Sequence, residues 1–297
     1  MIVLVTGSMR SGTSLLCQLF SKCGVDFLGD AEPIPCDELN QRQHNPNGYF
    51  ERLDVHQAYA ALYLAFETKR RKVDLVHDSE IDMAHPAVAA FKDKIRALAN
   101  RMHNTWGLKC IQMAQDPGLL NDVFLPAQQP VVWIYCFRTL KSVHQSMLHK
   151  CSGLPDYRIP ACYWKNHNLR FLQRHSAIAF PVLFVCYETL MSAPQATLAS
   201  LSTALVSLHH TWASALPDLH TEIQPTWQHF VAGSMTAGYS HAEKQVWDTL
   251  KLLETDFTYK TDAIKSLQLS EKPTQSPNAL CLCGSKLKYK KCCISLT

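Results

Sequence analysis

Residues 5–14 read Val-Thr-Gly-Ser-Met-Arg-Ser-Gly-Thr-Ser and follow an apolar run that begins at residue 1. After this stretch, apolar residues recur at the spacing of a helix, at Leu15, Leu16, Leu19 and Phe20. The pattern predicts a buried strand, a loop of small residues and a helix that starts near Thr13. Such a loop directs backbone N–H groups and a helix N-terminus toward an anion, so we expect a phosphate-binding loop here.

The loop departs from the commonest phosphate-binding motif at one position. Gly7 and Gly12 have the Walker A spacing, but Thr13 stands where that motif has its lysine, which reaches the β- and γ-phosphates of a nucleoside triphosphate. The cation of this loop is Arg10, which lies inside it, and Thr13 and Ser14 add hydroxyl groups. The composition therefore suits a short 5′-anion better than a triphosphate with Mg²⁺.

Met9-Arg10-Ser11-Gly12-Thr13-Ser14 resembles the 5′-phosphosulfate loop of the sulfotransferases that use 3′-phosphoadenylyl sulfate (PAPS). That loop has the form Pro-Arg/Lys-Ser-Gly-Thr-Ser/Thr, and Met9 replaces its proline. The resemblance implies that the donor is bound by Gly7, Met9, Arg10, Ser11, Gly12, Thr13 and Ser14. A small-residue turn without a ligand is the alternative for this loop considered alone, so a second motif is needed.

The second motif lies at 130–148, where an apolar run from Val131 to Phe137 predicts a parallel strand buried on both faces. Arg138 ends the run and Ser146 follows eight positions later. In the resembled family, an Arg and a Ser with this spacing bind the 3′-phosphate of the nucleotide. A guanidinium suits a phosphate because it donates two parallel hydrogen bonds. Thr139-Leu140 departs from the family's usual Asp/Asn-Pro, and an Arg that pairs with a carboxylate is the alternative.

A third apolar run, at 182–185, precedes Cys186-Tyr187-Glu188-Thr189-Leu190. These residues resemble the family's Tyr-Glu-Asp-Leu segment, whose Tyr can lie near the adenine, and this implies a nucleotide contact for Tyr187. A tyrosine that only packs at the end of a strand is the alternative interpretation.

Strand and helix patterns alternate along the chain, which predicts a three-layer α/β fold of the P-loop type with a central parallel sheet. We expect strands at 1–6, 106–110, 131–137 and 181–186, and helices near 13–22, 87–102, 140–150, 160–175 and 196–208. The segment 52–104 is helix-rich, and such insertions shape the acceptor pocket in the resembled family. The expected organisation is a sulfotransferase domain at 1–265, a polar linker at 266–278 and a small zinc-binding module at 279–297.

The overall composition narrows the expected partners and compartment. A net charge of +4 over 297 residues does not indicate a nucleic-acid partner, and none is expected. No apolar run approaches the roughly 20 residues of a membrane span, and no secretory leader is visible. Eight cysteines occur before residue 187 without a disulfide-like pattern, which favours buried reduced thiols and a cytoplasmic location.

Sulfuryl transfer requires a proton acceptor and cations for the leaving phosphate. Arg10 is one candidate cation. Lys109 is the second, because it resembles the Lys of the Lys-Thr-His sequence that ends a strand in the family. Glu51 is the candidate base, because Asn45-Pro46-Asn47-Gly48-Tyr49-Phe50-Glu51 resembles an element of the bacterial-type enzymes. A surface glutamate or one at a helix N-terminus, and an ordinary strand-end lysine, are the alternatives.

One family residue has no counterpart here. The cytosolic small-molecule enzymes place a catalytic His two residues after the Lys, and this chain has Ile111 at that position. His44 and His56 are held as reserve candidates for the base, although a lone His is more often structural.

The tail of the chain carries four cysteines within thirteen residues: Cys281, Cys283, Cys292 and Cys293. This spacing suits four thiolates around one tetrahedral Zn²⁺, and it resembles the SEC-C motif. Gly284, Ser285 and Tyr289 agree with that motif, whereas Leu282 and Lys286 replace its common Pro and Gly. The resemblance implies a structural zinc site that recruits a protein partner; a thiol-rich tail without metal is the alternative.

Together these patterns predict a sulfotransferase that uses PAPS and a small-molecule or glycan acceptor with a hydroxyl or amine group. A P-loop kinase or NTPase is an alternative, opposed by the missing Walker lysine. A nucleotide-binding adaptor without activity is another, because the family's catalytic His is missing.

Overall fold

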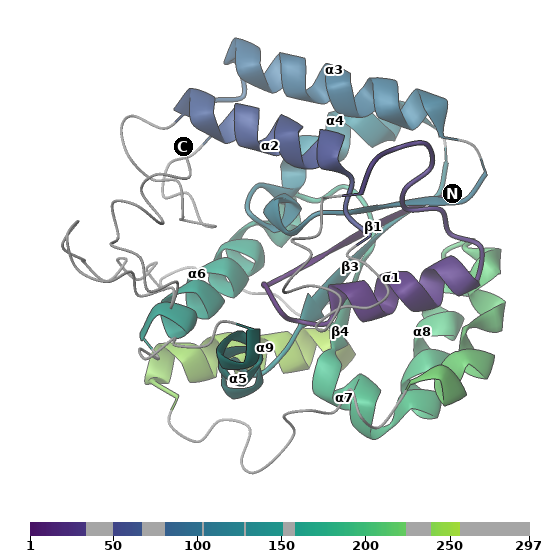
Figure 1. The fold of residues 1–297 in the computed structure, drawn as a ribbon, viewed down its shortest axis with the longest axis vertical. Helices are drawn as coiled ribbons and strands as arrows, with labels where there is room; N and C mark the ends of the chain where they lie inside the picture. Colours follow the sequence, from purple (N-terminus) through teal and green to yellow (C-terminus); the bar gives the residue numbers. More distant parts are fainter. Residues whose placement is uncertain are drawn as a thin grey trace.

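The computed structural model describes residues 1–33, 50–66, 81–102, 104–127, 129–150, 158–223 and 239–255. Its centre is a sheet of four parallel strands in the order β2-β1-β3-β4 (Figure 1). The strands are β1 (Ile2–Gly7), β2 (Trp106–Lys109), β3 (Val131–Phe137) and β4 (Val182–Cys186). The prediction of an α/β chain with a central parallel sheet is confirmed in the described part of the chain.

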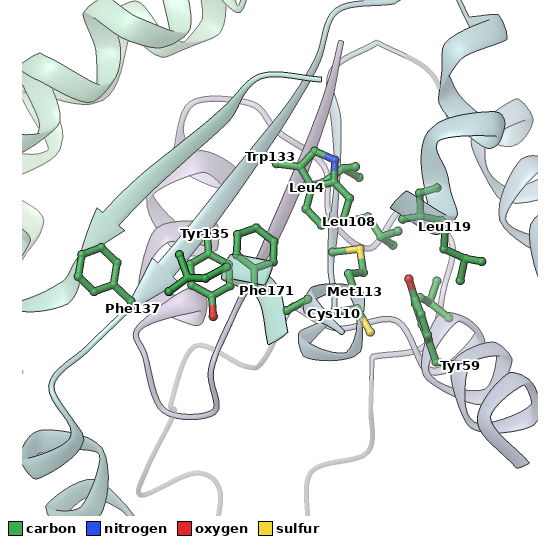
Figure 2. Close-up of a cluster of buried hydrophobic side chains, with 14 of the residues drawn as sticks. Leu4, Tyr59, Leu108, Cys110, Met113, Leu119, Trp133, Tyr135, Phe137 and Phe171 are labelled. Carbon is green, nitrogen blue, oxygen red and sulfur yellow. The ribbon is translucent and has the colours of Figure 1, made fainter. Parts of the chain in front are cut away.

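Side chains on both faces of the sheet are buried, which explains the near-continuous apolar runs in the sequence. In β3, Trp133, Tyr135 and Phe137 belong to the core on one face, and Val132, Ile134 and Cys136 belong to the core on the other. Figure 2 shows the first core, where Trp133, Tyr135 and Phe137 lie with Leu4, Leu108 and Phe171. Neither face of the sheet is left to solvent, as expected for parallel strands.

Helices cover both faces. The core that contains Trp133 is completed by α2 (Leu53–Phe66), α3 (Pro86–Arg101), α6 (Arg158–Arg174) and α9 (His241–Thr255). Figure 1 shows α2 and α3 lying along one another, away from α6 and α9. The opposite core is completed by α1 (Thr13–Lys22), α7 (Tyr187–Ser192), α8 (Pro194–Ser207) and the 3₁₀ segment η5 (Thr211–Glu222). The remaining elements are α4 (Asn121–Phe124), α5 (Leu140–Lys150), η1 (Ile111–Ala114), η2 (Pro117–Leu120), η3 (Leu125–Ala127) and η4 (His175–Ala177).

Helix ends differ from the sequence expectation where a proline or a cap decides them. The helices at 13–22 and 140–150 have the expected bounds, but α8 begins two residues early, at Pro194. A proline fits the first turn of a helix because the N–H that it lacks has no intrahelical partner there. Pro86 opens α3 in the same way, and the His85 ring caps it by accepting a hydrogen bond of 3.1 Å from the Ala87 N–H.

The six cysteines of the described residues are free thiols: Cys17, Cys23, Cys110, Cys136, Cys162 and Cys186. Cys23 and Cys162 are partly exposed, and the other four are buried. Desolvation raises the pKa of Cys186 to about 12, so this thiol stays protonated at neutral pH. In the described part of the chain, no helix combines the length and apolar character that a membrane crossing requires.

Candidate functional site

The loop between β1 and α1 holds two residues in the left-handed region of the backbone. Gly12 has φ +96°, which suits a glycine, but Arg10 has φ +65°. A left-handed conformation costs a residue with a side chain about 1–2 kcal/mol. Only one backbone hydrogen bond is identified inside this loop, from Ser11 N–H to the Ser8 carbonyl at 3.2 Å. Residues that adopt such unfavourable backbone conformations are found most often at functional sites.

The same loop contains buried hydroxyls without partners. The Oγ atoms of Ser8 and Ser11 are both buried, and neither has a hydrogen-bond partner among the described residues. The N-cap residue of α1 is Gly12, which has no side chain to cap the helix, and the first N–H groups of a helix lack intrahelical partners. Unpaired donors that converge at a helix N-terminus are the arrangement that binds a phosphate group.

Gly12 is required because Tyr187 packs directly on the loop. A Cβ atom at residue 12 would lie 2.5 Å from Cδ2 of Tyr187. The guanidinium of Arg138 lies over the ring of the same tyrosine, with its Cζ atom 4.0 Å from the ring centroid. The predicted residue Tyr187 therefore links the loop to Arg138, and it does so from the first turn of α7 rather than from a strand end.

Arg138 is a buried cation held by a buried carboxylate. Its Nε lies 3.8 Å from Oε1 of Glu188, and the two side chains are 7% and 3% exposed. Glu188 is itself fixed by the backbone N–H of Thr139, at 3.1 Å, and by the Thr139 hydroxyl, at 2.9 Å. The Arg138 carbonyl accepts a hydrogen bond of 2.7 Å from Trp164 Nε1. Thr139, which departs from the family pattern, therefore orients the carboxylate that orients Arg138.

The two motifs expected to bind the two ends of one nucleotide meet directly. Arg10 Nε donates to the Ser146 hydroxyl at 2.9 Å, and Arg138 Nη1 donates to the Arg10 carbonyl at 3.3 Å. Burial is the main cause that lowers the pKa of Arg138, and the Arg10 charge lowers it further, opposed by Tyr187 and Glu188. Two guanidinium groups thus repel each other in a partly dry site, and an anion between them would relieve that repulsion.

A third cation enters the loop from β2. Lys109 Nζ donates to the Ser14 hydroxyl at 2.8 Å and lies 3.0 Å from Oε1 of Glu51. The Lys109 side chain is 1% exposed and that of Glu51 is 16% exposed. The candidate cation and the candidate base are therefore partners in one ion pair at the end of the loop.

The residues on both sides of Glu51 are fixed by packing and by an ion pair. Phe50 has φ +57° and packs edge-on against Phe27, with the ring centroids 6.2 Å apart. On the other side, Arg52 is buried and pairs with Asp54, Nη2 to Oδ2 at 3.0 Å. The turn expected before Glu51, at residues 45–48, lies outside the described part of the chain.

A small hollow adjoins the loop and was not foreseen from the sequence. It is lined by Ser8 and Met9 of the loop, by α5 and by α6, through Val143, Met147, Pro160, Tyr163, Trp164 and His167. His167 is 3% exposed, and its Nε2 lies 3.2 Å from the carbonyl of Ile111. Position 111, where the resembled enzymes have a histidine, is an isoleucine here, and the imidazole of His167 from α6 lies beside its backbone.

The other candidate residues are distributed as follows. His56 contacts Gln112, Nδ1 to Nε2 at 3.4 Å, and neither residue lines the hollow. Thr13 is the first residue of α1 and is buried. His44 and the four tail cysteines, Cys281, Cys283, Cys292 and Cys293, lie outside the described residues. Within those residues, no group of three or more His, Cys, Asp and Glu side chains could hold a metal ion.

Comparison with known families finds a match at the end of the chain. Residues 278–294 match the SEC-C motif, which includes all four tail cysteines predicted from their spacing. No curated protein sequence matches the chain.

Proposed function

We propose that this chain transfers a sulfuryl group from PAPS to a hydroxyl or amine acceptor. The contact between Arg10 and Ser146 carries this proposal, because it joins the loop motif to the strand-end motif across 136 positions of sequence. Arg10 lies in the loop after β1 and Ser146 in the helix after β3, on the side of the sheet where the parallel strands end and where ligands bind in open α/β sheets. The unpaired hydroxyls of Ser8 and Ser11 fit a phosphate-bearing group in the same loop.

In this proposal the donor occupies two subsites. The 5′-phosphosulfate lies on the loop, at the backbone of Gly7, Met9, Gly12 and Thr13 and at the side chains of Ser11 and Ser14. The 3′-phosphate lies with Arg138 and Ser146, where Glu188 holds the guanidinium in one orientation. Tyr187 stacks between the subsites, against both Gly12 and Arg138, and supports the nucleotide there.

The transfer itself is an in-line displacement at sulfur. The acceptor oxygen or nitrogen forms a bond to sulfur while the bond between sulfur and the bridging phosphate oxygen breaks. The leaving product, adenosine 3′,5′-bisphosphate (PAP), gains negative charge on its 5′-phosphate, and Arg10 and Lys109 stabilise that charge. The proton of the acceptor must pass to a base, and Glu51 is the carboxylate beside this cation pair. Through its ion pair with Lys109, Glu51 also holds that cation beside the loop.

A kinase or NTPase activity is the weaker alternative. Lys109 brings a cation to Ser14, but from β2 and already paired with Glu51. The side chain at position 13, where the Walker lysine stands, is a buried threonine. A non-catalytic PAP-binding adaptor is the other alternative, since Ile111 replaces the family's catalytic His.

Release of PAP from PAPS, measured with phenol, an aliphatic alcohol or a primary amine as acceptor, tests the activity. We expect release that depends on the acceptor and is lost in Lys109→Met, while Lys92→Met, which removes the surface pair with Asp122, retains it. PAP binding without release on any acceptor would favour the adaptor, and acceptor-independent ATP hydrolysis would favour the NTPase.

For the tail, we propose that Cys281, Cys283, Cys292 and Cys293 bind one structural Zn²⁺ as thiolates, and that this module recruits a protein partner. The match to the SEC-C motif over 278–294 supports the assignment. Four thiolates suit a closed tetrahedral zinc site, and a segment this short depends on the metal for its folding energy.

A further inference from the structure

The side chain of Arg10 is directed toward α5, away from the part of the loop that the sequence assigns to it. Its Nε donates to the hydroxyl of Ser146, a buried residue of α5, at 2.9 Å. The sequence resemblance implies that Arg10 serves the 5′-phosphosulfate and that Ser146 serves the 3′-phosphate. The contact between them therefore brings the guanidinium of Arg10 to the 3′-phosphate subsite.

The backbone of Arg10 is held by the same subsite. Its φ of +65° is unfavourable for a residue with a side chain, so contacts around it must hold this conformation. One is the bond from its Nε to Ser146, and another is the bond of 3.3 Å that its carbonyl accepts from Nη1 of Arg138. Both partners belong to the motif expected to bind the 3′-phosphate, and this motif therefore supports the centre of the loop.

The hydrogen bond from Arg10 also decides what Ser146 can do. A hydroxyl can accept and donate at the same time. Since Nε of Arg10 can only donate, the Ser146 oxygen accepts from it, and the serine proton is directed elsewhere. A phosphate oxygen beside Ser146 would take that proton and an N–H of the same guanidinium, whose planar fork holds the Nη groups at a fixed angle to Nε.

The charges of the two arginines favour a doubly charged anion at this place. Burial is the largest cause that lowers the pKa of Arg138, and the charge of Arg10 lowers it further. Glu188 lies 3.8 Å from Arg138 and supplies one negative charge to this group. A phosphate monoester carries about 1.5 to 2 negative charges at pH 7, so it can compensate the repulsion between the guanidinium groups, which a 3′-hydroxyl cannot do.

We propose that Arg10 is a ligand of the 3′-phosphate, together with Arg138 and Ser146, a role that rests on the nucleotide site proposed above. The phosphate accepts from both guanidinium groups and from the Ser146 hydroxyl, which Arg10 orients. Because Arg10 is also part of the loop, a bound 3′-phosphate holds the loop in the shape that receives the 5′-anion. Lys109, which donates to Ser14 at 2.8 Å, is the cation in contact with the 5′-subsite of the loop.

The direct test uses adenosine 3′-monophosphate (3′-AMP) and 5′-AMP, each of which carries one of the two phosphates, and measures their affinities by displacement of PAP in calorimetric titrations. We expect Arg10→Met to weaken 3′-AMP by about 10- to 100-fold, as for the loss of a charged hydrogen bond, and 5′-AMP by less than about threefold. Arg10→Lys keeps the charge but lacks the planar fork, so it should also weaken 3′-AMP. The matched control is Arg96→Met, which removes a surface pair with Asp93 and should leave both affinities within about twofold.

The outcomes separate this role from the proposed function. A wild-type protein that does not bind PAP refutes the nucleotide site as a whole. Wild-type binding of PAP, with a loss for 5′-AMP in Arg10→Met at least as large as that for 3′-AMP, refutes only the 3′-phosphate role of Arg10. Arg10→Lys gives the same comparison if Arg10→Met does not fold. Combining Arg10→Met with Ser146→Ala should lose less binding free energy for 3′-AMP than the two single losses added together, and full additivity would contradict the orientation of Ser146 by Arg10.

Discussion

Replacement of Arg138 tests the 3′-phosphate subsite. The structure indicates how large the loss of binding free energy should be and which variants serve as controls. The guanidinium is 7% exposed and pairs with Glu188, which is 3% exposed. Two charged hydrogen bonds to a phosphate are lost with it, at about 1.5–3 kcal/mol for each bond in isolation. Because two such bonds from one group do not add fully, we expect PAP binding to weaken by about 2–4 kcal/mol, or roughly 30- to 900-fold.

The choice of variant matters, because Arg138→Ala alone leaves the buried Glu188 without its cation. Removing one partner of a buried ion pair destabilises a protein by about 3–5 kcal/mol, which would obscure a binding defect. The variant to measure is therefore Arg138→Met combined with Glu188→Gln, since the amide oxygen of the new side chain can still accept from the Thr139 N–H and hydroxyl. Glu188→Gln alone is the companion variant: it keeps the guanidinium and removes its carboxylate, so it also breaks the buried pair, and its free energy of unfolding is measured before its affinity is compared.

The assay is calorimetric titration with PAP and, in parallel, with 5′-AMP, which lacks the 3′-phosphate. The double variant should lose affinity for PAP and keep that for 5′-AMP, and Glu188→Gln should show a smaller loss for PAP because Arg138 is less well oriented. A folded double variant that binds PAP within threefold of the wild type would refute the 3′-phosphate role of Arg138. Equal losses for PAP and 5′-AMP would refute it as well.

Three further predictions follow from single features of the structure. Gly12→Ala should lower the free energy of unfolding by more than Gly24→Ala does. Both residues have positive φ, but the new Cβ at residue 12 would lie 2.5 Å from Cδ2 of Tyr187, whereas the Cβ at residue 24 would enter open space. Equal losses in urea titrations would contradict the contact. Burial lowers the pKa of His167 from 6.5 to about 4, so the folded protein holds the ring neutral at pH values where the unfolded chain would protonate it. The contribution of His167 to the free energy of unfolding is therefore complete above pH 6.5 and is lost as the pH falls toward 4. Urea titrations should therefore show the difference in stability between wild type and His167→Gln falling by about 3 kcal/mol from pH 7 to 4, and a constant difference would argue against a buried neutral ring. Cys292→Ser should abolish stoichiometric zinc with nucleotide binding intact, whereas Cys23→Ser, in the described domain, should retain the metal; zinc that persists in Cys292→Ser would show that the ligands are assigned wrongly.

Local pattern was enough to predict the loop and the strands that carry it. The helix after the loop and the helix from Leu140 both have their expected bounds, because a short polar segment separates each of them from the apolar strand that precedes it. The order of the strands and the pairing between them depend on contacts between residues far apart in sequence. Hydrophobic periodicity is a local pattern and does not predict such contacts. Thus Arg10 and Ser146 were each predicted, but their 2.9 Å contact was not.

The residues missed in the site are those whose role comes from packing. Glu188 stands in the segment that singled out Tyr187, yet only the structure shows its carboxylate buried against Arg138 and Thr139. His167 lies within a helical pattern and has no motif around it, so it gave no signal in the sequence. Its significance arises only where α6 meets the segment after β2, at the Ile111 carbonyl.

For Glu51, the structure adds a second possible role to the one predicted from the sequence. The turn predicted before it, at residues 45–48, lies outside the described residues, and Phe50, directly before Glu51, has a left-handed φ. The sequence could not indicate that this carboxylate pairs with Lys109, because the two residues come from separate elements 58 positions apart. That pair is the reason for considering Glu51 as an anchor of Lys109 as well as a base.

The central claim is that the loop and Arg138 bind a 3′-phosphorylated adenine nucleotide, and one calorimetric experiment on the wild-type protein tests it directly, with PAP as one titrant and ATP–Mg²⁺ as the other. We predict micromolar or tighter binding of PAP and no binding of ATP–Mg²⁺. Binding of ATP–Mg²⁺ without binding of PAP would contradict the account and would indicate a kinase-like protein with an unusual phosphate loop.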